Sequence, residues 1–335
     1  MTSLVLAAAW CLVYGVCCLA WALGAPGFPF GAADTRGPEM GSLLATADPG
    51  PTGVLFATGC AIALVAAGSA LRRPRRAHGV VLLVAAAVLL AVVPDVRLLQ
   101  NLAYSLGGYF GLVDWPVLNQ ALCVAGAGLL ARTGLVLVRS PADGTPSVVA
   151  SDDAAPSVAA GDAVRSAAAR WRTIGRWATL VAVLAPLPYA AQRAAWNLGI
   201  PLGVSEQFVD DLAADVAAKG LHPLAAWGLV IPDVVGVLLT LGLIMRWGER
   251  IPRWVPLLRG RRVPVSLAVI PASVVATAVT IAGVAIIRFA VADGQVHATA
   301  APGLLWLPWG IALGVATFAY AERRRATRTN TPAAR

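Results

Sequence analysis

Eight stretches of the sequence are each long and apolar enough to cross a membrane as a helix, and this feature restricts the fold more than any other. A bilayer-spanning helix needs about 20 predominantly apolar residues. Inside hydrocarbon the backbone must satisfy its own hydrogen bonds, which a helix does within one segment. The sequence therefore predicts an all-α fold, a polytopic transmembrane helical bundle of about eight spans. The stretches are residues 4–23, 53–71, 79–99, 116–138, 177–197, 223–245, 263–289 and 304–321.

The amino-acid composition agrees with a lipid-embedded chain. Hydrophobic residues make up 58% of the sequence and charged residues 13%, whereas a soluble globular protein carries about 25% charged residues. The net charge of +9 has the sign that binds nucleic acid, but the basic residues lie in short loops between the apolar stretches. We therefore expect the lipid bilayer, with anionic headgroups at the arginine-rich loops, to be the main partner, and no nucleic acid to bind.

The basic residues indicate how the chain is oriented. All but five of the 26 fall in the loops at residues 72–76, 132–176 and 246–262 or in the tail at 323–335. Short cytoplasmic loops are enriched in Lys and Arg, so this side is predicted to be cytoplasmic, with both termini on it, in a bacterial cytoplasmic (inner) membrane. The first stretch is expected to be retained, because no basic residue precedes it as in a signal peptide. The five exceptions are Arg36, Arg97, Arg193, Lys219 and Arg288.

A repeated pattern predicts that the chain consists of two related halves. The motif Y-x6-W-x-L-G-x-P occurs at residues 14–26 and again at residues 189–201. A four-span unit returns the chain to its starting side, so two copies would share one orientation, as in transporters built from parallel repeats. The predicted domains are a first four-helix repeat at residues 1–139, a flexible cytoplasmic linker at 140–176, a second four-helix repeat at 177–325 and a cytoplasmic tail at 326–335.

Two connecting segments have a local character of their own. Residues 140–162 are rich in Ser, Ala, Asp, Pro and Gly and lack the apolar mass to fold alone, and residues 163–176 are expected to form a short helix along the headgroups. Residues 203–220 repeat apolar side chains every four residues, which predicts an amphipathic helix on the outer face. Its apolar stripe is Phe208, Leu212 and Val216, with Ser205 as the N-terminal cap.

Ionisable residues inside the apolar stretches are the strongest functional indication, because each costs a few kcal/mol at the centre of a membrane helix. Asp233 lies deepest, near the middle of the sixth stretch and directly after Pro232. Asp95 follows Pro94, and these prolines are expected to break their helices. The candidate site residues are Asp233, Asp95, Arg97, Arg193 and Arg288, with Asn197, Asn119 and Gln120 as neighbouring hydrogen-bonding groups.

Two interpretations of these residues are open. In the first, acids and arginines of neighbouring helices form a buried network around an outward-facing polar cavity, which holds a small anion or headgroup, with Asp233 as a proton-titrating group. In the second, Arg97 and Arg288, which match each other in the two halves, extend along their aliphatic stems to the membrane surface, and Asp95 pairs locally.

No motif predicts a metal site, a cofactor or a catalytic residue. The five cysteines all lie within apolar stretches, and no Cys-x-x-Cys pair has histidines nearby. His78, His222 and His297 are widely separated, and the sequence contains no G-x-x-x-x-G-K-[ST] phosphate-binding loop. We expect no cofactor, and the sequence leaves an enzymatic activity open.

Two segments carry a resemblance to known proteins. Residues 21–31 and residues 246–256, the latter followed by Arg261-Arg-Val-Pro264, resemble uncharacterised multi-pass membrane proteins of actinomycete bacteria. Each half is also similar to a small four-span family of unknown function with a W-x-L-G motif. The resemblance implies a membrane location and assigns no activity or site residue.

The sequence favours a transporter-like or small-ligand-binding membrane protein whose partner is a small solute or ion. The first alternative is a structural or accessory membrane subunit whose arginine loops meet a cytoplasmic partner or anionic lipid. The second is an intramembrane enzyme that modifies lipids.

Overall fold

The computed structural model describes residues 2–106, 110–139, 158–218, 227–228, 230–251 and 260–329. Throughout these residues the secondary structure is helical, and the one extended pairing among them is an isolated bridge between Arg250 and Arg262. The predicted all-α fold is confirmed. The chain divides into two compact units: the first takes the described residues of Met1–Leu98 and Leu112–Ser151, the second those of Leu99–Gly111 and Asp152–Arg335.

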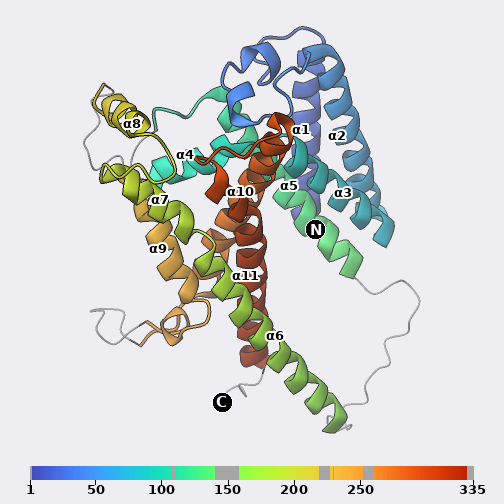
Figure 1. Ribbon diagram of the computed structural model, residues 1–335. Helices are drawn as coiled ribbons and strands as arrows, with labels where there is room; N and C mark the ends of the chain where they lie inside the picture. Colours follow the sequence, from blue (N-terminus) through green and yellow to red (C-terminus); the bar gives the residue numbers. More distant parts are fainter. Residues whose placement is uncertain are drawn as a thin grey trace. The chain divides into compact units, whose positions relative to one another are not determined.

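The first unit is built from two pairs of helices that pack side by side, α1 with α2 and α3 with α5, and α1 also contacts α5. Small residues let the backbones approach, as is usual between membrane helices. A Cβ atom added to Gly134 of α5 would lie 2.7 Å from the backbone oxygen of Gly79 on α3. The helices, shown in Figure 1, are α1 (Thr2–Ala22), α2 (Pro49–Arg72), α3 (Arg76–Val92) and α5 (Trp115–Arg139).

The helix predicted over residues 79–99 is broken at Pro94, as the sequence indicated. α3 ends at Val92, and α4 (Val96–Leu106) follows at an angle of 78° to it. Proline has no N–H to donate, so it interrupts the ladder of helical hydrogen bonds. Asp95 restarts the helix, because its carboxylate accepts the backbone N–H of Arg97 at 2.9 Å and so caps the first turn of α4.

In the second unit, α11 packs against both α6 and α10, and Pro186 separates α6 from α7. Short 3₁₀ turns, η4 (Arg246–Gly248) and η5 (Ala301–Leu305), connect the later helices. The helices are α6 (Val158–Leu184), α7 (Leu187–Asn197), α8 (Glu206–Ala218), α9 (Val230–Leu241), α10 (Val265–Asp293) and α11 (Trp306–Thr329).

Helices coincide with all eight predicted stretches, but they differ in length. Six described helical segments are long and apolar enough to span a membrane, and the bent pair α3–α4 makes a seventh if it counts as one span. The described residues of α9 extend about 18 Å at 1.5 Å per residue, short of the roughly 30 Å hydrocarbon core, and most of residues 223–229 of this stretch lie outside the described part of the chain. The eight-span count and the parallel orientation of two repeats therefore stay predictions. The six spans are Thr2–Ala22, Pro49–Arg72, Trp115–Arg139, Ala169–Asn197, Val265–Val291 and Ala301–Arg325.

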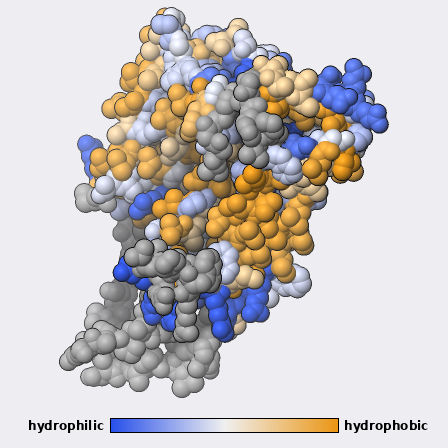
Figure 2. Space-filling model, turned by 90° about the vertical axis from the view of Figure 1, so that its left-hand side faces the viewer, coloured by the Kyte–Doolittle hydropathy of each residue, from blue (hydrophilic) through white to orange (hydrophobic). Residues whose placement is uncertain are grey.

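Apolar side chains cover much of the outer surface of these helices. In the view of Figure 2 hydrophobic side chains form broad areas of the visible surface, and hydrophilic side chains lie in smaller patches between and around them. Val16 on α1 and Val65 on α2 are 59% and 68% exposed. In water this exposed apolar surface would be unfavourable, whereas lipid tails accept it.

The two W-x-L-G-x-P motifs form the same kind of helix end. Gly24 after α1 has φ +92° and Gly199 after α7 has φ +78°, a left-handed conformation that favours glycine. In each motif the glycine N–H donates to the tryptophan carbonyl at 3.0 Å, and the next N–H donates to the carbonyl just before the tryptophan at 2.9 Å. This pair of hydrogen bonds is a Schellman cap, and the proline that follows prevents the helix from continuing.

The connecting segments agree only in part with the sequence analysis. Of the predicted linker, residues 140–157 lie outside the described residues, and residues 158–176 belong to α6, so the expected separate helix at 163–176 is the first part of a longer one. The helix predicted within residues 203–220 is present as α8, and the Phe208 N–H donates to the Ser205 hydroxyl oxygen at 3.2 Å, while its location on the outer face stays a prediction. Val209, rather than Phe208, is its most buried apolar residue.

The close approach of α3 and α5 gives a test of this packing. Gly134→Ala should lower the free energy of unfolding by about 1–3 kcal/mol, because the new methyl group would meet a backbone oxygen that cannot rotate away. Gly128→Ala is the matched control on the same helix, since a Cβ there meets nothing within 4 Å. Unfolding in mixed detergent micelles measures both variants, and equal stability of the two would contradict the described contact.

Candidate functional site

Arg97 is the most completely buried large side chain of the first unit and lies directly after the helix break. It is the second residue of α4, and its side chain has an accessible surface of 0%. A buried guanidinium costs several kcal/mol unless opposite charges and hydrogen bonds compensate for the lost water. The interpretation in which Arg97 extends to the membrane surface is therefore wrong for this residue.

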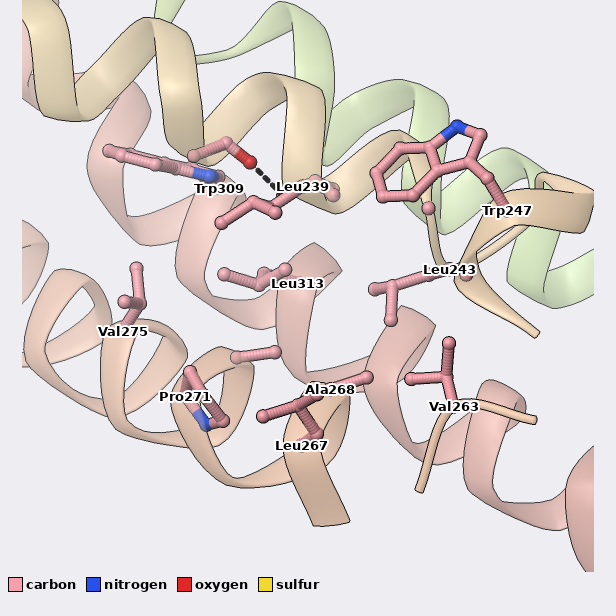
Figure 3. A pocket seen from close by; sticks show the side chains of 15 residues that line it. Leu239, Leu243, Trp247, Val263, Leu267, Ala268, Pro271, Val275, Trp309 and Leu313 are labelled. Carbon is pink, nitrogen blue, oxygen red and sulfur yellow. Dashed lines mark hydrogen bonds between the residues drawn. The ribbon is translucent and has the colours of Figure 1, made fainter. Parts of the chain in front are cut away.

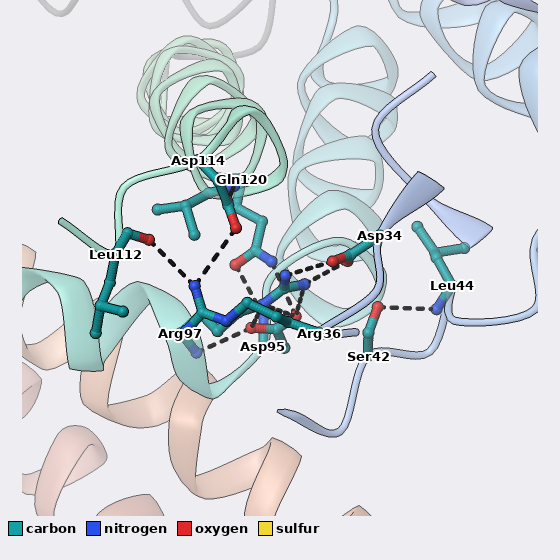
Figure 4. Close-up of polar contacts among 10 residues, drawn as sticks. Asp34, Arg36, Ser42, Leu44, Asp95, Arg97, Leu112, Asp114 and Gln120 are labelled. Carbon is teal, nitrogen blue, oxygen red and sulfur yellow. Dashed lines mark hydrogen bonds and ion pairs between the residues drawn. The ribbon is translucent and has the colours of Figure 1, made fainter. Parts of the chain in front are cut away.

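Two carboxylates hold the guanidinium from different directions (Figure 4). Asp34 binds its outer edge with both oxygens: Nη1 donates to Oδ1 at 2.6 Å and Nη2 donates to Oδ2 at 2.5 Å. Asp95 binds another edge, where Nη2 donates to Oδ2 at 2.6 Å and Nε donates at 3.1 Å. Both carboxylates are buried, Asp34 with 4% and Asp95 with 0% of its surface exposed.

Gln120 of α5 completes the set of contacts around Asp95. Its Nε2 donates to the Asp95 Oδ2 at 2.9 Å, and its Oε1 accepts the Asp95 backbone N–H at 3.2 Å. The Gln120 amide therefore donates one hydrogen bond to Asp95 and accepts another from it, which connects the helix break to α5. Three of the predicted site residues, Asp95, Arg97 and Gln120, are thus brought into direct contact.

Asp34 reaches the site because the loop between α1 and α2 folds back over the first unit. The loop contains two 3₁₀ turns, η1 (Gly31–Ala33) and η2 (Pro38–Met40), and Asp34 follows the first of them. Gly37 packs tightly beside it, so that a Cβ there would lie 2.8 Å from the Asp34 Oδ2. The position of the carboxylate is therefore determined by a compact loop rather than by a helix.

Buried aromatic rings anchor this loop to the helices. Phe28 packs edge-on against Trp21 of α1 at a ring-centroid distance of 6.2 Å, and Phe30 stacks against Phe56 of α2 at 6.0 Å. The Trp115 indole N–H at the start of α5 donates to the Gly27 carbonyl at 2.7 Å. The hydrophobic Gly-Phe-Pro-Phe stretch thus holds the loop in the position where Asp34 meets Arg97.

A second ion pair at the edge of the loop is far more exposed. Arg36 Nη1 lies 3.4 Å from Asp114 Oδ2 and donates to the Leu112 carbonyl at 3.2 Å. The side chains of Arg36 and Asp114 are 29% and 36% exposed. Exposed pairs contribute only about 0–1 kcal/mol to stability, so this contact offers a natural comparison for the buried one.

Asn119 lies in a neighbouring polar contact rather than in the charged cluster. The Tyr14 hydroxyl of α1 donates to the Asn119 Oδ1 at 3.2 Å, and the Cys123 thiol is 3.1 Å from the same hydroxyl. Asn119 has 0% exposure. It therefore links α1 to α5 beneath the site and does not touch Arg97.

The remaining predicted residues belong to the second unit and make no ion pair with one another that the described residues record. Asp233 lies in α9, whose described residues begin at Val230. Its Oδ2 is buried and has no hydrogen-bond partner within the described part of the chain. Arg193 of α7 lies 5.5 Å above the Trp196 ring. Arg288 lies on α10, and Asn197 is the last residue of α7.

The charged cluster is packed rather than hollow. Three cavities described for the two units, of about 540 and 820 Å³ in the first and 320 Å³ in the second, are lined by other residues. Arg97 and Asp95 themselves have no accessible surface. The loop that carries Asp34 closes the site.

Sequence reasoning missed Asp34 as a site residue. Only ionisable residues inside the apolar stretches were considered as candidates, although an arginine inside a span requires a counter-ion, which a loop can supply. The useful signal was that Asp34 directly follows the hydrophobic Gly-Phe-Pro-Phe-Gly-Ala-Ala stretch, which a solvent-exposed loop would not need.

Comparison with known proteins adds no assignment: no protein-family model, no curated protein and no solved structure matches the chain. The site must be interpreted from its own geometry.

The two ion pairs of the loop give a matched test of burial. Asp34→Asn should lower the free energy of unfolding by about 3–5 kcal/mol, because it leaves one edge of a buried guanidinium without its charge partner. Arg36→Gln, two residues away, should cost no more than about 1 kcal/mol. Chemical unfolding in detergent, repeated at high salt, distinguishes them, and similar losses for both variants would show that Asp34 is not buried against Arg97.

Proposed function

We propose that this chain is a multi-pass membrane protein that binds a small anion at Arg97, in a transporter-like or ligand-binding role, with the Asp34 loop as the element that closes the site. The observation that carries the proposal is the bidentate contact between the Arg97 guanidinium and a carboxylate that belongs to a loop. Arginine matches the geometry of carboxylate and phosphate groups through two parallel hydrogen bonds. Asp34 therefore occupies the place that a small anion would take.

The charges of the site support exchange between Asp34 and an anion. With both carboxylates ionised, one guanidinium and two carboxylates carry a net charge of minus one. If the loop moves away, Asp95 stays with Arg97, because it caps the same helix, and the pair that is left is neutral. The outer edge of the guanidinium is then vacant, and an incoming carboxylate or phosphate restores the charge state of the closed site.

The helix break also favours ligand binding. Discontinuous helices at membrane depth are a recurring feature of transporter sites, where the N-terminal end of a half-helix faces an anionic group. Here α4 begins at Val96, 78° away from the direction of α3. Arg97 and the first turn of α4 thus combine a fixed positive charge with the positive end of a helix dipole.

The arginine-rich loops support a location in the bacterial cytoplasmic membrane, with both termini in the cytoplasm. We further propose that the two units are parallel repeats. In support, the motif around Gly24 and the motif around Gly199 end their helices with the same hydrogen bonds. The packing of α3 with α5 also has a counterpart in that of α10 with α11.

An accessory membrane subunit is the second candidate, because the basic loop after α2 is exposed. Arg72, Arg73 and Arg75 have no recorded hydrogen bond or ion pair with the described residues. They are therefore available to a cytoplasmic partner or to anionic lipid. In that case loss of Arg97 would affect stability alone, and neutralising these arginines would abolish the function.

Acetate tests the anion site, because it reproduces the carboxylate that Asp34 supplies. Asp34→Ala removes this internal competitor, so the variant should bind acetate at least about tenfold more tightly than the wild type. The thermal unfolding midpoint in detergent, measured against chloride at constant ionic strength, reports binding by mass action. The wild type should respond at higher acetate concentrations, and Arg36→Gln should respond as the wild type does.

The double variant Asp34→Ala/Arg97→Gln provides the decisive comparison. It should show no acetate-specific stabilisation, because the guanidinium that receives the anion is gone. An equal response of the single and the double variant would remove Arg97 from the site. If acetate stabilises Asp34→Ala but does not stabilise the wild type at any concentration, the loop keeps the site permanently closed. That result contradicts the proposed function.

Labelling tests the proposed orientation. In a variant with all five cysteines replaced by alanine, Thr35→Cys should react with a membrane-impermeant maleimide in intact cells. Arg75→Cys and Arg261→Cys should react only in inverted vesicles, because the positive-inside rule assigns both loops to the cytoplasm. Reaction of Arg75→Cys and Arg261→Cys from opposite sides would rule out the topology.

A further inference from the structure

The α2–α3 hairpin leaves an apolar groove along its length. A cavity of about 540 Å³ lies between the two helices, with α1 and Leu130 of α5 also contributing to its wall. Thr52 to Ala63 of α2 line it over about 16 Å of helix. Val80, Val84 and Val88 of α3 face it from the other side, each at least half exposed. No Asp or Glu is among its lining residues.

Glycines keep this groove open. A Cβ atom on Gly59, which lines the groove, would meet nothing within 4 Å, and the same holds for Gly68 further along α2. These glycines therefore do not serve close helix packing, in contrast to Gly79 and Gly134 of the same unit. They leave room for a molecule that is not part of the chain.

A basic cavity lies at the end of the hairpin, and its lining residues Val65 and His78 come two residues beyond Ala63 and Val80 of the groove. It measures about 820 Å³ and is lined by Gly68 and Ser69 of α2 together with Arg72, Arg73, Arg75 and His78. α3 begins here without an acidic residue in its first turn and without a side-chain cap, so its N-terminal end adds a positive dipole. The Nδ1 atom of His78 is buried and has no hydrogen-bond partner in the described part of the chain.

We propose that the α2–α3 hairpin binds one anionic phospholipid, with an acyl chain in the groove and the phosphate at the basic cavity. The proposal rests on charge complementarity: an apolar groove that lacks carboxylates lies next along the hairpin to a cluster of three arginines and a helix N-terminus, which matches the chemistry of a phosphate attached to a hydrocarbon chain. A free phosphate would not use the groove, and a neutral lipid would not use the arginines. The inference does not depend on the anion site at Arg97.

The second unit contains a groove between the helices that would correspond to α2 and α3 if the units are repeats. Its cavity of about 320 Å³ lies between α9 and α10, with Trp309 and Leu313 of α11 in its wall (Figure 3). Gly236 lines it, and a Cβ there also meets nothing within 4 Å. If the units are repeats, open grooves occur at corresponding places in both.

Native mass spectrometry of the delipidated full-length protein in detergent tests the site. All variants carry Gly236→Phe, which fills the second groove, and palmitoyl-oleoyl phosphatidylglycerol is titrated against the corresponding phosphatidylcholine. We expect one phosphatidylglycerol to bind at least tenfold more tightly than phosphatidylcholine. Gly59→Phe should abolish this binding by filling the groove, whereas Gly128→Phe, at an equally open position on α5, should leave it unchanged.

The headgroup contribution is measured separately, with variants at exposed positions that do not disturb folding. Arg72→Gln/Arg73→Gln should make the affinities for the two lipids equal. Arg172→Gln/Arg176→Gln removes the same charge from exposed positions of α6 and should retain the preference. The proposal is overturned if Gly59→Phe binds phosphatidylglycerol as tightly as the wild type does. It is also overturned if Arg72→Gln/Arg73→Gln keeps the preference for phosphatidylglycerol. In either case the bound lipid is only the exchangeable lipid that surrounds any membrane helix.

Discussion

The burial of one guanidinium is the constraint on which the first unit depends. Arg97 has no accessible surface, and a charge in such a place must be matched by opposite charges in good geometry. The helix break supplies Asp95, α5 supplies Gln120, and the loop between α1 and α2 supplies Asp34. The local geometry of three separate segments is therefore coupled to a single side chain.

The same coupling explains why the first unit differs from the second. After its Schellman cap the first unit continues into the aromatic loop that carries Asp34, whereas the second continues into the amphipathic helix α8. Arg288 matches Arg97 in the sequence, but Ile286 stands where the first half has Asp95. If the units are repeats, the aspartate that precedes the arginine by two residues occurs only in the first half.

Local features of the chain were predictable, and long-range ones were not. The helices follow from apolar runs of about 20 residues, the break follows from Pro94, and Asp95 and Arg97 are close in sequence. The contact of Asp34 with Arg97 joins residues 63 positions apart through a loop without regular structure, and no periodic pattern indicates such a pairing. The end of α9 at Leu241, before the predicted end of the sixth stretch at residue 245, was also missed, because hydropathy alone does not detect where an apolar segment stops being helical.

A double-mutant cycle between Asp34 and Arg97 tests the central claim most directly. Stability in detergent is measured for the wild type, Asp34→Asn, Arg97→Gln and the double variant. The account predicts a coupling free energy of at least about 1.5 kcal/mol, because the two side chains form a buried bidentate pair. A coupling within about 0.5 kcal/mol of zero would mean that the two residues act independently, and the closed anion site described above would not exist.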